Sequence, residues 1–268
     1  MSKQWFLPSA KLRPYIDRYW YWDDENKVPP VFPGTGNELL FHFRKPFRME
    51  TDGHEIPLPL AYLCAPRFHA FSLSADEPVE FLAVRFRSSA FRHFCAIPFN
   101  ELSDRFVSPE ALWGRDGVLL EEQIAALSTL EEKLVLLDRF FLVECQRYHQ
   151  DDVWLDQFVE SIYYRYSTFR LDEAEREVPL GRRQLERKFL GAVGVSPKVF
   201  QRNARFQGVL KQLLLKHKTD YLDTALSSGF YDQAHFIREF KRYTGTTPGS
   251  FLRDENFMTH FYNEHIAI

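Results

Sequence analysis

The chain has 268 residues, more than one average domain and fewer than three, so we expect two domains that each bury a core. Hydrophobic residues make up 45% and charged residues 26%, and no run approaches the roughly 20 apolar residues of a membrane span. The N-terminal stretch lacks the apolar core and small-residue cleavage site of a signal peptide. We therefore expect a cytoplasmic protein with no membrane partner.

Charge is distributed unevenly along the chain. The net charge is −3, but residues 181–218 contain ten basic residues against one acidic residue, a local charge of +9, so the rest sums to −12. Such asymmetry indicates a nucleic-acid-binding region inside an otherwise acidic protein. The three cysteines are widely spaced and odd in number, which fits reduced core thiols better than a disulfide framework or a thiolate metal site.

The first hundred residues contain short apolar runs separated by Pro and Gly. Residues alternate between apolar and polar over Glu38–Arg44 and Phe81–Arg87, and turn residues stand at Pro33–Gly36 and Asp52–Gly53. This pattern predicts a β-rich domain over residues 1–105, folded as a small, cupin-like barrel or sandwich.

A helical period follows this β-rich part. Ser88 is expected to cap a short helix through Phe94, and Thr129 with Glu132 forms a capping-box pattern at the start of a longer one. The longer helix carries an apolar stripe: Leu130, Leu134, Leu137 and Phe141. Residues 106–150 are thus expected to be a helical linker. The stripe either packs on its own domain or forms the seam of a dimer.

Helical patterns dominate residues 151–254, and residues 255–268 form a tail. In YLDTALSSGFYDQAHFIREFKRY (residues 221–243), a short apolar-faced helix ends at Gly229, Phe230 fills the corner, and Asp232 is placed to cap a second helix. Two short helices joined by a glycine turn, the second with a polar outer face, are typical of a helix-turn-helix unit that enters a major groove.

A similar unit precedes it. The pattern places one helix around Leu171 and Ala174, a turn at residues 179–181, and a second helix with Leu185 and Phe189 on its buried side. A long helix, roughly Pro197 to His217, is expected to hold the two units at a fixed separation. The fold class is therefore α+β with two domains, the second all-α with two helix-turn-helix motifs.

The outer faces of the two second helices have residue types that suit DNA recognition. Arginine pairs with guanine, glutamine with adenine and glutamate with cytosine, whereas alanine and isoleucine contact the thymine methyl group. The base-facing candidates are Arg183, Glu186, Arg187, Gln233, Ala234, Ile237 and Arg238. The candidates for phosphate contacts are Arg182, Lys188, Lys216, Lys241 and Arg242.

Residues 155–252 resemble the AraC/XylS family of bacterial transcription regulators. The resemblance is carried by the string from Ala225 to Arg242, by Gly245 and Thr247-Pro248, and upstream by a set that comprises Leu185, Arg187, Phe189, Gly194, Ser196-Pro197 and Arg205. It implies that the base-facing residues named above contact bases. One departure is Gly181, where the family usually has a serine N-cap.

The front domain resembles the β-rich sensor domain found on a subset of these regulators, through Tyr19-Trp20, Pro33-Gly34, residues 38–41 and residues 84–86. This resemblance implies a small-molecule effector and a homodimer. RNA polymerase is a further candidate partner, which an activator would contact, but the sequence leaves activation and repression open. The side chains suited to line an effector pocket are Trp20, Trp22, Phe41 and His42, although an aromatic-rich core explains them equally well.

Two other classes of function remain open. An enzyme is one, although the sequence lacks the common hydrolase, zinc-protease and P-loop motifs. His42, His54 and His69 are the candidate ligands of a cupin-type metal enzyme, but isolated histidines on strands are more often structural, so we expect no metal and no cofactor. The other class is a protein-interaction module whose helix-turn-helix units do not bind DNA.

Overall fold

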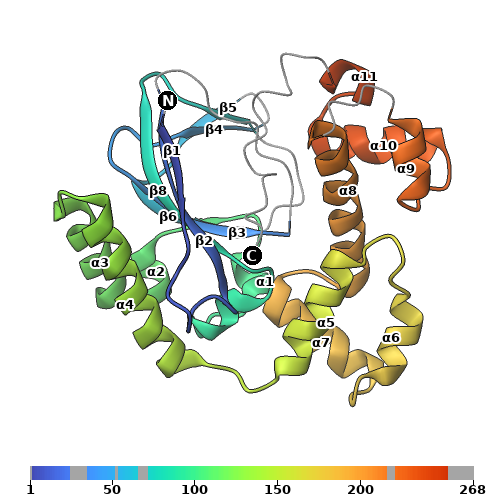
Figure 1. The fold of residues 1–268 in the computed structure, drawn as a ribbon, viewed down its shortest axis with the longest axis horizontal. Coiled ribbons are helices and arrows are strands. Elements are labelled where there is room, and N and C mark those ends of the chain that lie inside the picture. Colours follow the sequence, from blue (N-terminus) through green and yellow to red (C-terminus); the bar gives the residue numbers. More distant parts are fainter. Residues whose placement is uncertain (1, 25–34, 52–53, 66–71, 216–220, 253–268) are drawn as a thin grey trace.

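The computed structural model describes residues 2–24, 35–51, 54–65, 72–215 and 221–252. We call residues 2–150 the front domain, which is rich in strands, and residues 151–252 the C-terminal domain, which is helical (Figure 1). The two are joined between helices α4 (Leu130–Tyr148) and α5 (Val153–Tyr164). Within the described ranges, no helix is long and apolar enough to cross a membrane.

The front domain contains two antiparallel sheets, which confirms the β-rich prediction. One sheet has the strand order β1-β2-β8-β3-β6-β9 and the other has the order β5-β4-β7. Their strands are β1 (Ser2–Phe6), β2 (Ile16–Asp24), β3 (Asn37–His42), β4 (Arg48–Thr51), β5 (His54–Pro57), β6 (Ala61–Cys64), β7 (Ser72–Ser74), β8 (Val79–Phe86) and β9 (Phe106–Val107). Side chains from both sheets share one apolar cluster, so the arrangement is sandwich-like.

The two faces of the larger sheet bury different side chains, because successive residues of a strand point to opposite sides. In β3, Leu40 packs in the cluster with Trp20 and Trp22 that faces the smaller sheet. Leu39 and Phe41 pack in the other cluster, with Leu82 and residues of the helices that follow. The predicted strand over Glu38–Arg44 ends two residues earlier than expected, at His42.

Helices cover this second face of the larger sheet (Figure 1). They are the 3-10 helix η1 (Ala90–His93) and the α-helices α1 (Phe99–Leu102), α2 (Pro109–Trp113), α3 (Arg115–Ala126) and α4. The capping box at the start of α4 is confirmed: Glu132 N–H donates to Thr129 Oγ1 at 3.3 Å, and Thr129 N–H donates to Glu132 Oε2 at 3.1 Å. The helix predicted after Ser88 is the short η1, whose N-cap is Ser89.

The apolar stripe of α4 is used inside the chain. Leu137 and Phe141 are fully buried against the sheet, and Leu130 and Leu134 pack against the same cluster. Of the two uses predicted for the stripe, packing on its own domain is confirmed, whereas a dimer seam that includes the half-buried Leu130 and Leu134 stays a prediction. Residues 109–148 therefore share the core of the front domain instead of forming a separate linker.

The C-terminal domain contains two small cores connected by one long helix. Its helices are α5, α6 (Leu171–Glu177), α7 (Arg182–Val193), α8 (Pro197–Leu215), α9 (Leu222–Ser227), α10 (Gln233–Thr244) and α11 (Pro248–Phe251). Phe200 of α8 packs in the core of α5 and α7, whereas Phe206, Val209 and Leu213 of the same helix pack in the core of α9 and α10. The predicted long helix between the two units is thus confirmed.

Candidate nucleic-acid interface

The second helix-turn-helix unit consists of α9 and α10. Gly229 has φ = 88° in the turn after α9, a conformation that costs glycine little. Phe230 packs edge-on against Phe236 of α10, with ring centroids 5.0 Å apart. The Asp232 side chain accepts a hydrogen bond from His235 N–H at 2.6 Å and so caps the first turn of α10. All three local predictions for this unit are confirmed.

The first unit consists of α6 and α7, and its second helix begins differently. The N-cap of α7 is Gly181, which has no side chain to accept a hydrogen bond from the first turn. Leu185 and Phe189 are fully buried, and α7 ends at Gly194, whose φ is 86°. The buried side of α7 and its C-terminal end at Gly194 therefore follow the sequence pattern. Its N-terminal end has no side-chain cap.

Helix α8 connects the two units rigidly. Its Arg205 donates from Nη1 to the carbonyl oxygen of Gly229 at 3.2 Å and so holds the turn of the second unit. Near the end of α10, the Tyr243 hydroxyl donates to Asn203 and accepts a hydrogen bond from Arg202 Nε at 3.2 Å. Each contact ties the second unit to α8, whose first half packs on the first unit.

Most of the predicted base-facing side chains are exposed on the outer faces of α7 and α10. Arg183, Glu186 and Arg187 are exposed on α7, as are Gln233, Ala234 and Arg238 on α10, while Ile237 is half-buried. Within the described residues, Arg183, Arg187 and Arg238 form no ion pair or side-chain hydrogen bond with the protein. Glu186 lies 3.3 Å from Arg182, one helical turn away, so its carboxylate is partly neutralised.

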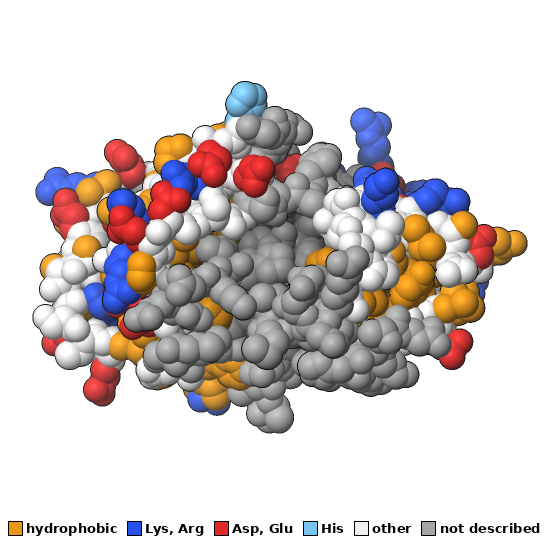
Figure 2. All heavy atoms as spheres, turned by 90° about the horizontal axis from the view of Figure 1, so that it is seen from above, with side chains coloured by type: hydrophobic (Ala, Val, Ile, Leu, Met, Phe, Trp, Pro, Cys, Tyr) orange, Lys and Arg blue, Asp and Glu red, His pale blue; other side chains and the backbone are white. Residues whose placement is uncertain are grey.

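The predicted phosphate-contacting residues fall into three groups. Lys241 is exposed on α10, and Arg242 is exposed but lies 3.8 Å from Glu239. Arg182 lies near two carboxylates, and Lys188 lies 2.8 Å from Asp152. Lys216 is outside the described residues. Figure 2 shows Lys and Arg gathered along one edge of the C-terminal half of this view, whereas the front half intermixes both signs of charge.

The structure separates the residues proposed for the effector pocket. Trp20, Trp22 and His42 are buried on the sheet face toward the smaller sheet, where the His42 ring packs against Phe47 at 4.7 Å, but Phe41 points to the opposite face. Phe41 therefore cannot share a pocket with His42. Burial lowers the pKa of His42 to about 4, so its ring is neutral at pH 7.

The three histidines proposed as metal ligands are not brought together in the described part of the chain. His42 is buried beside Tyr62, His54 is exposed on β5, and His69 lies outside the described residues. No group of three or more His, Cys, Asp or Glu side chains suited to a metal occurs among the residues that the structure describes. The cysteines Cys64, Cys95 and Cys145 are free thiols, as expected, and Cys95 is buried.

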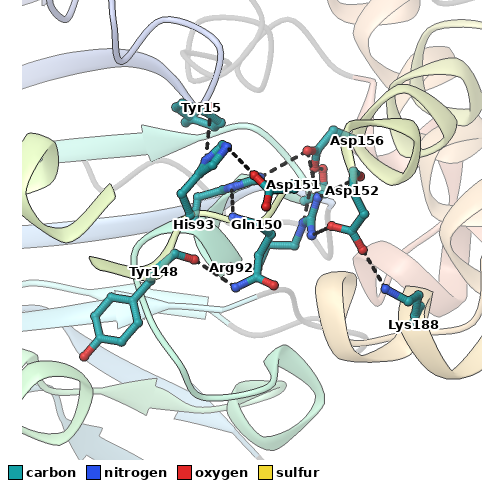
Figure 3. Close-up of polar contacts among 11 residues, drawn as sticks. Tyr15, Arg92, His93, Tyr148, Gln150, Asp151, Asp152, Asp156 and Lys188 are labelled. Atoms are coloured by element: carbon teal, nitrogen blue, oxygen red, sulfur yellow. Dashed lines mark hydrogen bonds and ion pairs between the residues drawn. The ribbon is translucent and has the colours of Figure 1, made fainter. Parts of the chain in front are cut away.

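Sequence reasoning missed a polar cluster between the two domains (Figure 3). Arg92 of η1 donates from Nη2 to Asp156 of α5 at 2.8 Å and pairs through Nη1 with Asp152, the N-cap of the same helix. Ser89 donates to Asp156 at 2.7 Å. These partners are separated by about sixty residues in sequence, so no local pattern indicates that they meet.

His93 completes this cluster in a defined tautomer. Gln150 N–H donates to His93 Nδ1 at 3.1 Å, so the proton lies on Nε2, which donates to Asp156 Oδ2 at 3.1 Å. Burial by itself raises the pKa of Asp156, but hydrogen bonds from His93, Arg92 and Ser89 outweigh it and hold that pKa below its usual value. Asp156 is therefore ionised at neutral pH.

Two protein families match this chain, one in its front domain and one in its C-terminal domain. Residues 175–254 match a family described as "Helix-turn-helix domain", and residues 4–108 match one described as "Domain of unknown function (DUF6597)". The curated "HTH-type transcriptional regulator MtrA" of Neisseria gonorrhoeae is 36% identical over 87 residues, which is 32% of this chain and 28% of that protein. The C-terminal part of this chain is therefore similar to a helix-turn-helix family and to part of a curated transcriptional regulator, in agreement with its resemblance to the AraC/XylS family.

The arrangement of both domains also has a solved counterpart. ToxT from Vibrio cholerae is 15% identical, and the superposition covers 87% of this chain and 97% of that chain with a TM-score of 0.50. At this identity the likeness concerns the fold, a β-rich region followed by a helical one. The sequence resemblance to the AraC/XylS family is thus confirmed, and it points to a class of regulators rather than to an enzyme family.

Proposed function

We propose that this chain is a sequence-specific transcription regulator that binds double-stranded DNA with α7 and α10 in two successive major-groove segments. The observation that carries the proposal is the set of exposed arginines on the two reading helices, Arg183, Arg187 and Arg238, which have no protein partner within the described residues. An arginine without an internal partner is available for guanine O6 and N7, which accept two hydrogen bonds from one guanidinium group.

The length of α8 supports reading by both units at once. Successive major-groove segments on one side of DNA recur every 34 Å or so. Helix α8 has 19 residues and, at 1.5 Å per residue, is about 28 Å long. Its two halves pack in the two cores, so the helix that joins the two units is nearly as long as the separation of two successive major-groove segments.

Within this proposal, the seven predicted base-facing residues read sequence. They are Arg183, Glu186 and Arg187 of the first unit and Gln233, Ala234, Ile237 and Arg238 of the second. Phosphate contacts come from Arg182, Lys188, Lys241 and Arg242, and from Lys216, which lies outside the described residues. Tyr231, which is 88% exposed at the start of α10, is a further candidate that the sequence pattern did not single out.

The test is a selection of bound DNA from a random library with purified protein at two salt concentrations. We expect a motif of two blocks about one helical turn apart, and an affinity that falls steeply with salt because phosphate-bound counterions are released. The matched control is Arg139→Ala, which removes an exposed arginine from α4 of the front domain and is expected to leave the motif unchanged. Failure of the wild-type protein to enrich any DNA would refute the proposal.

We also propose that the front domain holds the effector site and that the chain acts as a cytoplasmic homodimer that contacts RNA polymerase. Support for an effector comes from His42, whose buried Nδ1 has no hydrogen-bond partner among the described residues and lies among the aromatic rings near Trp22. A ligand group that accepts from this nitrogen when the Tyr62 hydroxyl donates to Nε2, or that donates to it in the other tautomer, would satisfy this atom. Equal operator affinity with and without every ligand that binds the front domain would refute the effector proposal.

The division of the chain is part of the same proposal. The front domain extends through α4, because the helices of residues 109–148 share the core of the sheet. The DNA-binding domain begins near Asp152, the N-cap of α5, and extends through α11. Limited proteolysis is expected to cut between Tyr148 and Val153 first, because this is the connection between the two cores.

A further inference from the structure

The polar contacts between the two domains lie mainly on α5 and its N-cap, a helix that packs in the core of the first unit. Among the described residues, hydrogen bonds and ion pairs join the front domain to Asp151 and Asp152, to α5, to Gln207 of α8 and to Gly194 after α7. Thr35 donates to Gln207 of α8 at 2.9 Å, and Ser103 donates to the carbonyl of Gly194 at 3.3 Å. Within the described residues, α10 has no hydrogen bond or ion pair with the front domain, and Arg205 and Asn203 of α8 hold the second unit.

Asp152 occupies the centre of these contacts (Figure 3). One carboxylate oxygen pairs with Arg92 of the front domain, and the other lies 2.8 Å from Lys188 Nζ of α7. Asp152 thus links the front domain to the reading helix through two cations. Burial favours a higher pKa for Asp152, but Lys188 and Arg92 outweigh it and keep its pKa below the usual value, so the carboxylate is charged at neutral pH.

The two sides of this link differ in exposure. The Arg92 side chain is 11% exposed and is also held by Asp156, whereas the Lys188 side chain is 46% exposed on the reading helix. An ion pair with one half-exposed lysine is weak and easily exchanged, whereas a buried arginine held by two carboxylates is not. Lys188 is therefore the partner that can leave.

We propose that Asp152 and a DNA phosphate compete for Lys188, so that the same ammonium group is bound to the front domain through Asp152 in free protein and to the DNA backbone in the complex. This inference rests on the proposed function. Because Asp152 also holds Arg92, the exchange couples DNA contact by the first unit to the strength of the domain junction. By linkage, any change in the front domain that displaces Arg92 alters the affinity for DNA.

The experiment compares two substitutions that each remove one negative charge from α5. Asp152→Asn releases Lys188 but keeps an oxygen that accepts from Arg92. Glu160→Gln is the matched control, because Glu160 lies 3.8 Å from Arg87 of the front domain and does not contact Lys188. Affinity for the selected operator is measured over a range of salt concentrations for both variants, alone and combined with Lys188→Gln.

We expect Asp152→Asn to raise the affinity about threefold to tenfold and to steepen the salt dependence by up to one unit, since one more cation is free for phosphate. Glu160→Gln is expected to change neither quantity measurably. In the Lys188→Gln background, the effect of Asp152→Asn disappears.

Three results would overturn the inference: equal effects of the two α5 substitutions, a gain by Asp152→Asn that persists without Lys188, or no gain at all. Protein that does not bind DNA in any form would refute the proposed function instead. Melting temperatures of each variant identify a loss of folding, and Lys188→Gln, at an exposed position, keeps the test usable if Asp152→Asn is unstable. Lys188→Gln by itself is then expected to reduce the salt slope by about one unit.

Discussion

The two helix-turn-helix units have the same order of elements but are held in different ways. The second reading helix, α10, is capped by the Asp232 side chain and has no polar contact with the front domain within the described residues. The first, α7, begins at Gly181 without a side-chain cap but is fastened to the front domain through Asp152 and Gly194. Order at the second unit therefore arises locally, whereas order at the first depends on tertiary contacts.

The largest expected effect is a loss of stability on replacing the glycine that follows α7, compared with the glycine that follows α10. Gly194 and Gly245 both have positive φ, where alanine costs about 1 to 2 kcal/mol. A Cβ at Gly194 would lie 2.3 Å from Ser103 Oγ and 3.3 Å from the Phe99 carbonyl, whereas a Cβ at Gly245 meets no atom within 4 Å. Chemical denaturation is expected to show a loss of about 3 kcal/mol for Gly194→Ala and about 1 kcal/mol for Gly245→Ala.

The double variant Gly194→Ala with Ser103→Ala sharpens this comparison. Removing the Ser103 hydroxyl relieves the closest contact, so the double variant is expected to recover part of the stability that Gly194→Ala loses. Equal losses for the two glycine variants would mean that the front domain does not hold the end of α7 closely.

The next effect concerns Asp156 of α5, a helix that packs in the core of the first unit and not in that of the second. Asp156→Asn removes a carboxylate that accepts hydrogen bonds from Arg92, His93 and Ser89, so we expect a loss of about 1 to 3 kcal/mol. Hydrogen exchange measured by mass spectrometry should show faster exchange in α5 and α7 and unchanged exchange in α10. Equal acceleration in α7 and α10 would contradict the asymmetry between the units.

Acidification is expected to reproduce this effect in the unsubstituted protein. Since the folded pKa of Asp156 is lowered, its stabilising contribution is fully present above the ordinary aspartate pKa of about 3.9 and is lost as the pH falls through the folded pKa. Unfolding free energies measured from pH 7 downward should therefore fall less steeply below about pH 4 for Asp156→Asn than for the wild type.

The reading helices can be compared directly through their unpartnered arginines. Arg238→Ala and Arg183→Ala are each expected to cost about 1 to 3 kcal/mol of binding and to relax the preference at one base position. The position is expected to lie in a different block of the operator for each variant. Library selections with both variants check this, and relaxation in the same block would contradict the assignment of one block to each unit.

The smallest effects concern the starts of the two helices. Asp232→Ala removes the cap of α10 and is expected to destabilise the protein by about 1 kcal/mol. Gly181→Ser supplies the missing side-chain acceptor to α7 and is expected to stabilise it by only a few tenths of a kcal/mol. Thermal unfolding measures both. A gain from Gly181→Ser as large as the loss from Asp232→Ala would show that α7 lacks effective tertiary support.

Sequence reasoning succeeded where structure depends on neighbouring residues and failed where it depends on distant ones. The short helix after Ser88 was placed correctly, but the Ser89 hydroxyl binds Asp156 of α5 instead of capping that helix. Placing Phe41 and His42 in one pocket was an error that strand geometry already excludes, because adjacent residues of a strand face opposite sides. Lys188 was predicted to meet phosphate, and its pairing with Asp152 was not foreseen.

The sequence by itself determined the two helix-turn-helix units, the long helix between them and the exposed faces of α7 and α10. Helix period, Gly229 and the Asp232 cap act over a few residues, so their effect can be read from the chain. Only the tertiary structure decided that the α4 stripe packs on its own domain and that Arg92, Asp152 and Lys188 meet. These contacts form only when separately folded segments pack together, and no local pattern in the sequence records which surfaces will be in contact.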